Sequence, residues 1–169
     1  MSQTRNIQKV LIANRGEIAV RVIRTCKKLG IATVAIYSEV DRKSRHVRMA
    51  DQAFCVGPGP SSESYLRMEY IIEISKENGV DAIHPGYGFL SENAVFANRL
   101  KEEGIILIGP SAEAMEVMGS KLASKAAVAK NNVPLVPGVD HAVEDPEEAK
   151  RIAKEIGFPV LVKASAGGG

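Results

Sequence analysis

The chain has 169 residues, of which 45% are hydrophobic, 25% charged and 5% aromatic, and its formal net charge is +2 at pH 7. This composition is typical of a soluble α/β protein with one main core, and the low net charge and lack of Trp argue against a nucleic-acid-binding surface. Because the apolar runs are too short to span a bilayer and the polar residues 1–8 do not resemble a signal peptide, we expect a cytoplasmic protein with no membrane partner.

Short β-branched runs alternate with helical patterns over the first 119 residues. The predicted strands are Val10–Ala13, Thr33–Tyr37, Gln52–Val56, Ala82–His84 and Ile105–Ile108. The predicted helices are Glu17–Leu29, Tyr65–Glu77, Glu92–Glu102 and Ser111–Met118. Such alternation is typical of a parallel sheet with flanking crossover helices. We therefore expect a Rossmann-like domain over residues 1–119, with its chemistry on the loops at the carboxyl ends of the strands.

The pattern changes after Gly119, which predicts the start of a second domain over residues 120–169. Asp145 and Pro146 predict the cap and first residue of a helix, with Glu148 completing a capping box and Gly157 ending the helix. An apolar segment, Val160–Lys163, then predicts a buried strand.

The segment Ala13–Glu17 lies where a dinucleotide-binding fold carries its glycine-rich turn. It contains one glycine where that fingerprint needs three, and Arg15 would crowd a pyrophosphate, so a nicotinamide or flavin site is disfavoured. A plain strand-to-helix turn explains Gly16 but leaves the polar neighbours Asn14, Arg15 and Glu17 unexplained.

The predicted helix that follows carries Arg21, Arg24 and Lys28 opposite its apolar stripe. Such a face is either simply solvated or a contact surface for an acidic partner or a second subunit.

The densest motif is residues 84–93, His-Pro-Gly-Tyr-Gly-Phe-Leu-Ser-Glu-Asn, which follows a predicted strand. Tyr87 and Phe89 are either plates displayed on an irregular loop or aromatics tucked into the core, and the residues alone leave both open. Ser91 is predicted to cap the next helix, whose amino terminus would favour an anion nearby. His84, taken alone, is more typical of a structural histidine than of a catalytic one.

A glycine run, Gly167-Gly168-Gly169, follows Lys163 and a three-residue link. Glycine amides wrap around phosphate oxygens and a lysine supplies positive charge, so this arrangement predicts phosphate binding. A flexible linker is the alternative. Because a natural domain rarely ends on such a loop, we expect the chain to be a fragment of a longer protein.

The two cysteines, Cys26 and Cys55, stand apart within apolar patterns and show no metal-ligand spacing. They are predicted to be reduced core residues, as in a reducing compartment. No metal site is predicted within these residues.

Four segments together resemble biotin carboxylase, the ATP-grasp component of acyl-CoA carboxylases and of pyruvate carboxylase. In chain order they are residues 10–19, 84–93, 118–121 and 163–169. The resemblance extends from about Ile7 to the last residue and implies a Rossmann-like domain followed by the beginning of an ATP-grasp domain, truncated in its glycine-rich lid.

The resemblance implies a two-step ligase reaction. Bicarbonate attacks the terminal phosphate of ATP to give carboxyphosphate, and biotin on a carrier protein then takes the carboxyl group. It also implies Mg²⁺ as a cofactor, a carboxyltransferase component as a partner, and a homodimer or larger complex for the full-length protein. The acceptor that is finally carboxylated does not follow from this sequence.

The resemblance also implies roles for individual residues. Those expected to bind ATP are Lys121, Lys163, Gly167, Gly168 and Gly169. Those expected at the biotin pocket or the edge of the active site are His84, Tyr87, Gly88 and Glu92, and Arg21 and Arg24 are expected at a subunit interface. Ser120 departs from the aspartate that many members carry there, with little expected consequence.

The family's magnesium ligands, bicarbonate-binding arginine and general base are expected beyond residue 169, so this chain alone is expected to be inactive. Two alternatives stay open at this point. One is another ATP-grasp ligase, such as a carbamoyl-phosphate-forming or purine-pathway enzyme, although residues 13–17 and 84–93 do not suit it. The other is a stand-alone assembly module acting through Arg21 and Arg24.

Overall fold

The computed structural model describes residues 6–119, 124, 128, 134, 138–139 and 141–162. The chain divides into two compact units, residues 1–112 and 113–169. The predicted second-domain start at residue 120 stays a prediction, because residues 120–123 are outside the described part.

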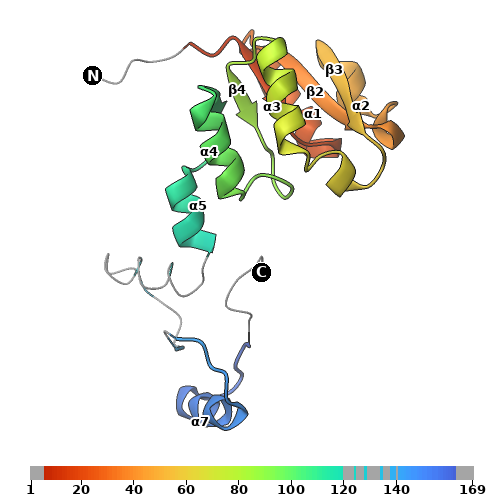
Figure 1. Cartoon of the computed structure of the whole chain (residues 1–169). Helices are drawn as coiled ribbons and strands as arrows, with labels where there is room; N and C mark the ends of the chain where they lie inside the picture. The colour runs from red at the N-terminus through yellow and green to blue at the C-terminus, as the bar shows by residue number, and fades with distance from the viewer. Residues whose placement is uncertain are drawn as a thin grey trace, which may run out of the picture. The chain divides into compact units, whose positions relative to one another are not determined.

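The first unit is built on one sheet of five parallel strands, in the order β3-β2-β1-β4-β5 (Figure 1). The strands are β1 (Lys9–Ile12), β2 (Ala32–Ser38), β3 (Gln52–Gly57), β4 (Ala82–His84) and β5 (Ile106–Leu107). Each predicted strand is confirmed to within one residue at each end. The expected Rossmann-like α/β fold is therefore confirmed.

Three predicted helices of this unit are also confirmed: α1 (Gly16–Lys28), α3 (Met68–Glu77) and α4 (Ala94–Glu102). A short helix, α2 (Arg45–Met49), and two 3₁₀ turns, η1 (Glu39–Asp41) and η2 (Ser61–Glu63), were not predicted. Elements of three to five residues are too short to show a helical period in the sequence.

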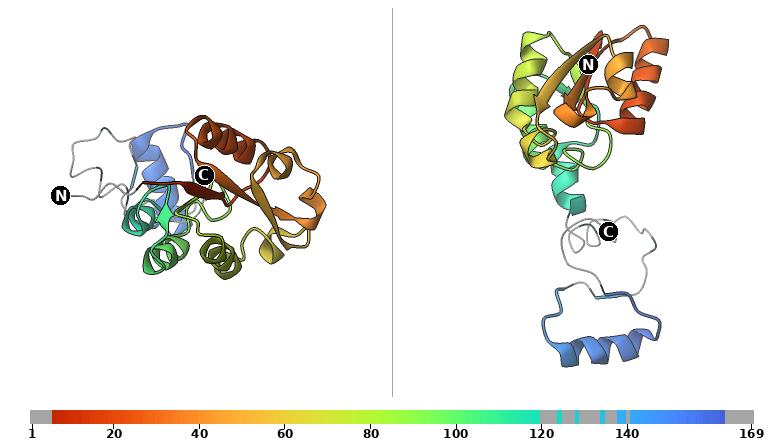
Figure 2. Two further views of the ribbon diagram at one scale, coloured as in Figure 1. Left: turned by 90° about the horizontal axis from the view of Figure 1, so that it is seen from above. Right: turned by 90° about the vertical axis from the view of Figure 1, so that its right-hand side faces the viewer.

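Helices cover both faces of the sheet (Figure 2). Alternate residues of β1 point to opposite faces, so Val10 and Ile12 pack with α1, whereas Leu11 packs with α3 and α4. All three side chains are almost fully buried. This two-sided burial explains why β1 reads as a continuous apolar run.

The two cysteines also belong to this unit, and both are free. Cys26 is buried against β1, as predicted. Cys55 is only half-buried, so the expectation of a core position was right for Cys26 and too strong for Cys55.

In the second unit, α5 (Ala112–Gly119) begins at the boundary, and α7 (Pro146–Ile156) follows. The predicted start of α7 is confirmed, because the Asp145 carboxylate accepts hydrogen bonds from the backbone N–H of Glu147 and of Glu148, both at 3.2 Å. Gly157 ends the helix with a φ of 90°, a left-handed conformation that glycine adopts without strain.

The strand predicted at Val160–Lys163 was wrong for its described residues. Residues 160–162 are not in a strand, and Leu161 and Val162 are 78% and 90% exposed. A strand needs a neighbour to pair with, and none of the described strands pairs with this segment. Lys163 lies outside the described residues.

Among the described helices, none has the length and apolar composition needed to cross a membrane.

Candidate functional site

Two loops meet at the point where the strand order of the sheet reverses. Strand β1 pairs with β2 on one side and with β4 on the other, so the chain proceeds outward in both directions from β1. The loops after β1 and β4 therefore lie next to each other at the carboxyl edge of the sheet, where open α/β sheets bind their ligands. These are the loops that carry the two densest sequence motifs, residues 13–17 and 84–93.

The side chain of Asn14 joins the two loops. Its amide nitrogen donates to the carbonyl oxygens of Pro85, at 2.7 Å, and of Tyr87, at 2.8 Å, while its amide oxygen accepts from the backbone N–H of Arg15 at 2.8 Å. Asn14 is only 4% exposed. Its buried amide is thus satisfied by the β4–α4 loop, and the side chain of Asn14 fixes that loop against the end of β1.

Gly86 is required by this close approach. A Cβ atom at position 86 would lie 2.7 Å from the Asn14 amide nitrogen, and the φ of Gly86 is +67°. Any larger residue would therefore meet both a steric clash and the cost of a left-handed backbone.

Tyr87 extends from the same loop towards solvent and is 60% exposed. Its hydroxyl donates a short hydrogen bond to Glu17, in the first turn of α1. This hydrogen bond is the main reason that the pKa of Tyr87 is raised. Glu17 thus holds an otherwise exposed ring in one orientation.

The sequence left open whether Tyr87 and Phe89 are displayed on the loop or tucked into the core, and the structure shows one in each arrangement. Tyr87 is displayed, whereas Phe89 is half-buried and stacks on Tyr65, with ring centroids 5.0 Å apart and planes 7° apart. Tyr65 is hydrogen-bonded to Asp41, which lies just after β2. Sequence reasoning did not select Tyr65 or Asp41, although an acidic residue soon after a strand end was a usable signal.

His84, the last residue of β4, has a structural role in its own loop. Its Nδ1 accepts a hydrogen bond from the backbone N–H of Gly86 at 3.0 Å, and burial lowers the pKa of the ring. A neutral imidazole is therefore favoured, with its proton on Nε2. This agrees with the prediction made for His84 taken alone.

The amino terminus of α4 is capped by Asn93, not by Ser91 as predicted. The Asn93 side chain accepts a hydrogen bond from the backbone N–H of Phe96 at 2.9 Å. The chain turns once more before the helix begins, because Ser91 and Asn93 donate their N–H groups to Gly88 and Leu90. Glu92 and Gly88 are both exposed on this loop, as a role at the edge of a site requires.

Arg21 and Arg24 are exposed on α1, on the helix face away from the sheet. Together with Ser44 and Arg45, at the start of α2, they border a hollow of about 490 Å³. It is lined by Gly16, Glu17, Val20, Arg21, Arg24, Ser44 and Arg45. Three arginines against one carboxylate make this hollow basic, so it favours an acidic partner.

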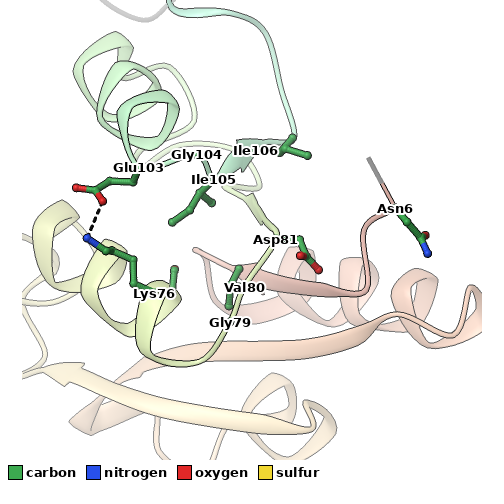
Figure 3. A pocket seen from close by; sticks show the side chains of 10 residues that line it. Asn6, Lys76, Gly79, Val80, Asp81, Glu103, Gly104, Ile105 and Ile106 are labelled. Carbon is green, nitrogen blue, oxygen red and sulfur yellow. Dashed lines mark ion pairs between the residues drawn. The ribbon is translucent and has the colours of Figure 1, made fainter. Parts of the chain in front are cut away.

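A second hollow, of about 410 Å³, lies at the amino edge of the sheet and contains none of the predicted site residues. The Lys76 ammonium and the Glu103 carboxylate form an ion pair across its rim at 2.6 Å (Figure 3). Because it is at the opposite end of the strands from the two interlocked loops, it is not part of the candidate site.

The residues predicted to bind ATP are outside the described part of the chain. They are Lys121, Lys163, Gly167, Gly168 and Gly169. Within the described ranges there is no group of three or more His, Cys, Asp or Glu side chains that could hold a metal ion.

Comparison with protein families divides the chain in two. Residues 6–115 match the family model described as the N-terminal domain of biotin carboxylase, and residues 120–169 match the ATP-binding domain of the carbamoyl-phosphate synthase L chain.

Curated relatives and solved structures agree with the first match. The biotin carboxylase of Halalkalibacterium halodurans is 60% identical over 96% of this chain, and the mitochondrial propionyl-CoA carboxylase alpha chain of Homo sapiens is 58% identical over 98% of it. The biotin carboxylase domain dimer of Hydrogenobacter thermophilus 2-oxoglutarate carboxylase, solved with MgADP, ADP and bicarbonate, is 56% identical over 98% of this chain, with a TM-score of 0.89. A biotin carboxylase from Campylobacter jejuni in complex with β-γ-ATP has a TM-score of 0.90 and 47% identity over 97% of this chain.

The chain spans only part of the length of these proteins. It covers 36% of the Halalkalibacterium enzyme, 23% of the human alpha chain and 36% of the Hydrogenobacter domain.

Proposed function

The chain belongs to the biotin carboxylase family, and on that premise we propose that it supplies the N-terminal part of an ATP-dependent ligase that carboxylates biotin. In this proposal ATP and bicarbonate form carboxyphosphate, and biotin on a carrier protein accepts the carboxyl group. The observation that carries the proposal is the interlocking of the two motif loops by Asn14 at the reversal point of the sheet. This is the edge at which such a fold binds ligands.

The exposed ring of Tyr87, the open backbone at Gly88 and the exposed carboxylate of Glu92 are proposed to border the biotin pocket. Tyr87 is suited to this role because Glu17 fixes its hydroxyl while its ring stays accessible. His84 would act indirectly, by accepting the Gly86 N–H and so shaping the loop.

ATP is proposed to bind through Lys121, Lys163 and the glycines 167–169. Two basic side chains and a run of accessible backbone N–H groups suit the triphosphate. Relatives solved with MgADP, ADP, bicarbonate or β-γ-ATP support these ligands. Mg²⁺, when bound, would neutralise charge on the phosphates, but no described residue of this chain is assigned to hold it.

We further propose that α1 contributes to a homodimer interface through Arg21 and Arg24. The basic hollow beside them and the dimeric state of the Hydrogenobacter relative support this. A biotin carrier and a carboxyltransferase are proposed as the other partners. The two free cysteines support a reducing compartment, which we propose to be the cytoplasm.

The proposal is tested with the full-length protein that carries this chain. Purified protein, ATP, Mg²⁺, radiolabelled bicarbonate and free biotin should yield acid-labile label on biotin, with one ADP formed per carboxylate transferred. Lys163→Gln should lower this rate at least about a hundredfold, because positive charge at the phosphates stabilises the transition state. Lys154→Gln, which removes an exposed lysine of α7, is the matched control and should leave the rate unchanged. Wild-type protein that cleaves ATP without labelling biotin would refute the proposed function.

The interface is tested separately by sedimentation of the full-length protein. Arg21→Glu and Arg24→Glu together should shift the dimer towards monomer, whereas Lys101→Glu, a charge reversal at an exposed residue of α4, should not. Unchanged mass in the double variant would exclude this interface.

A further inference from the structure

The conformation of the β4–α4 loop is supported by two residues outside it, the buried Tyr65 and the part-buried Asp41. We infer that Asp41 and Tyr65 are positioning residues for biotin carboxylation, acting through the stack of Tyr65 on Phe89. This inference rests on the proposed function.

The loop has a backbone that needs external support. Phe89 has a φ of +42°, and it alone among the non-glycine residues of the described part has a positive φ. Gly86 and Gly88, just before it, have φ values of +67° and +64°. An unfavourable conformation at a bulky residue persists only where the surroundings hold it, and such positions cluster at functional sites.

The ring of Tyr65 supplies that support to Phe89. The two rings lie nearly parallel, with centroids 5.0 Å apart. Tyr65 is 1% exposed, so its ring has little freedom to move and forms a fixed surface for Phe89. Offset stacking of this kind stabilises one arrangement of the two rings over others.

The orientation of Tyr65 is in turn fixed by hydrogen bonds at its hydroxyl. The hydroxyl donates to an Asp41 carboxylate oxygen at 2.7 Å and accepts from the backbone N–H of Ser38 at 3.0 Å. Burial, together with the hydrogen bond to Asp41, raises the pKa of Tyr65 to about 12. The hydroxyl therefore keeps its proton, and the donated hydrogen bond persists through the neutral pH range.

Asp41 is held as a charged acceptor by several donors. The oxygen that Tyr65 contacts also accepts from the Arg15 guanidinium at 3.1 Å and from the Ser38 hydroxyl at 3.0 Å. Burial acts to raise the pKa of Asp41, but the hydrogen bonds from Tyr65, Arg15 and Ser38 outweigh it and lower that pKa. The Arg15 guanidinium also lies over the Tyr65 ring, 5.7 Å from its centroid.

The β4–α4 loop is thus held by contacts at both of its ends. Asn14 and Glu17 hold the Pro85–Tyr87 half, and Tyr65 holds Phe89. Gly88 lies between these two sets of contacts. Loss of the Tyr65–Phe89 stack should therefore displace the part of the loop that we propose to border biotin. The residues proposed to bind ATP are elsewhere in the sequence. The expected consequence is selective damage to the transfer of the carboxyl group to biotin.

The test uses three variants of the full-length protein. Tyr65→Phe keeps the stack but removes the hydroxyl, Tyr65→Leu removes both, and Ile23→Ala removes buried volume from the core on the other face of the sheet. Each is assayed for the KM of free biotin, for ATP cleavage with bicarbonate but no biotin, and for amide hydrogen exchange of residues 86–93.

Tyr65→Leu should raise the KM of biotin or lower the carboxylation rate at least about tenfold, with less than about a twofold change in biotin-independent ATP cleavage. Its loop amides should exchange at least about tenfold faster than in wild type. Tyr65→Phe should fall between wild type and Tyr65→Leu. Ile23→Ala should lower the melting temperature without changing the KM of biotin or the exchange of the loop.

Three results would overturn the inference. The first is loop exchange in Tyr65→Leu equal to that of wild type. The second is an equal loss in both half-reactions, and the third is the same loss in Ile23→Ala; either of these would indicate general destabilisation. Failure of the proposed function is distinguishable, because it would leave wild type without biotin carboxylation whatever the loop exchange shows.

Discussion

Two nearly identical tripeptides of this chain have opposite structures. Val10-Leu11-Ile12 is the central strand β1, with Leu11 fully buried, whereas Val160-Leu161-Val162 forms no strand and leaves Leu161 78% exposed. The two tripeptides differ in their structural neighbours, because β1 is flanked by β2 and β4 and covered by helices on both faces. Apolar, largely β-branched residues thus permit a strand, but a strand forms only where there are neighbours with which to pair and pack.

Helix α1 of the first unit and helix α7 of the second unit show the same dependence on packing. Both α1 and α7 have an apolar stripe, and α7 has the better cap, with Asp145 bonded to two backbone N–H groups. Yet α1 buries Ala19, Val22, Ile23 and Cys26, whereas α7 buries none of its residues. Local signals suffice for α7 to form, and tertiary packing is what anchors α1.

The largest expected contrast is between Leu11→Ala and Leu161→Ala. The first should lower the free energy of unfolding by about 2–5 kcal/mol, because it leaves a cavity in the core. The second should change it by less than about 0.5 kcal/mol when both variants are made in this 169-residue chain, because the Leu161 side chain is exposed there. Urea unfolding followed by circular dichroism measures both. Equal losses would show that Leu161 is buried in solution and would remove the contrast between the tripeptides.

A second contrast lies within the motif loop. Gly88→Ala meets open space and should cost about 1–2 kcal/mol, from the left-handed backbone alone. Gly86→Ala should cost more, because its Cβ would also push on Asn14 and break the hydrogen bonds to Pro85 and Tyr87. Denaturant unfolding of the two variants gives the comparison. If both lose the same stability, then Asn14 does not constrain the loop.

Removing a helix cap should have a different measurable effect in each of the two units. Asn93→Ala and Asp145→Ala each remove a side-chain cap and should each cost about 1 kcal/mol. For Asn93 the loss should appear in the main unfolding transition, because α4 packs into the core. For Asp145 it should appear as faster amide exchange of α7, with an unchanged main transition. A shift of that transition in Asp145→Ala would mean that α7 unfolds together with the sheet.

The smallest effect is expected from pH and should be confined to the first unit. Burial lowers the pKa of His46 and of His84 below 6.5, so protons bind the unfolded chain more readily than the folded one. Stability should therefore be full above about pH 7 and should decrease as the pH falls through 6.5 towards the folded-state values. His46 is fully buried, and its Nδ1 lacks a hydrogen-bond partner among the described residues.

Urea unfolding at pH 7.5, 6.5 and 5.5 measures this effect. Replacing His46 or His84 by Asn should flatten the decrease, since each change removes one of the groups that protonate on unfolding. A wild-type stability that rises between pH 7.5 and 5.5 would contradict the assigned direction of both pKa shifts.

The candidate site was predictable to the extent that its residues are consecutive. The loop 84–93 was selected because glycine, proline and aromatics follow a strand, and it does lie at the carboxyl edge of the sheet. The role of Asn14 was not predictable, because its partner Tyr87 is 73 residues away. The prediction of Ser91 as the cap was wrong for a similar reason, since the residue that caps α4 depends on where the loop closes and not on propensity.

The sequence by itself determined the five strands, the principal helices and the position of the two motif loops, because alternation, capping residues and glycine are local and act on neighbouring residues. Only the tertiary structure decided that residues 160–162 do not form a strand, that Phe89 is half-buried while Tyr87 is exposed, and that Asp41, Tyr65 and Phe89 lie together. These outcomes depend on contacts between residues distant in the chain, and a pairing of that kind has no period or spacing that a single sequence displays.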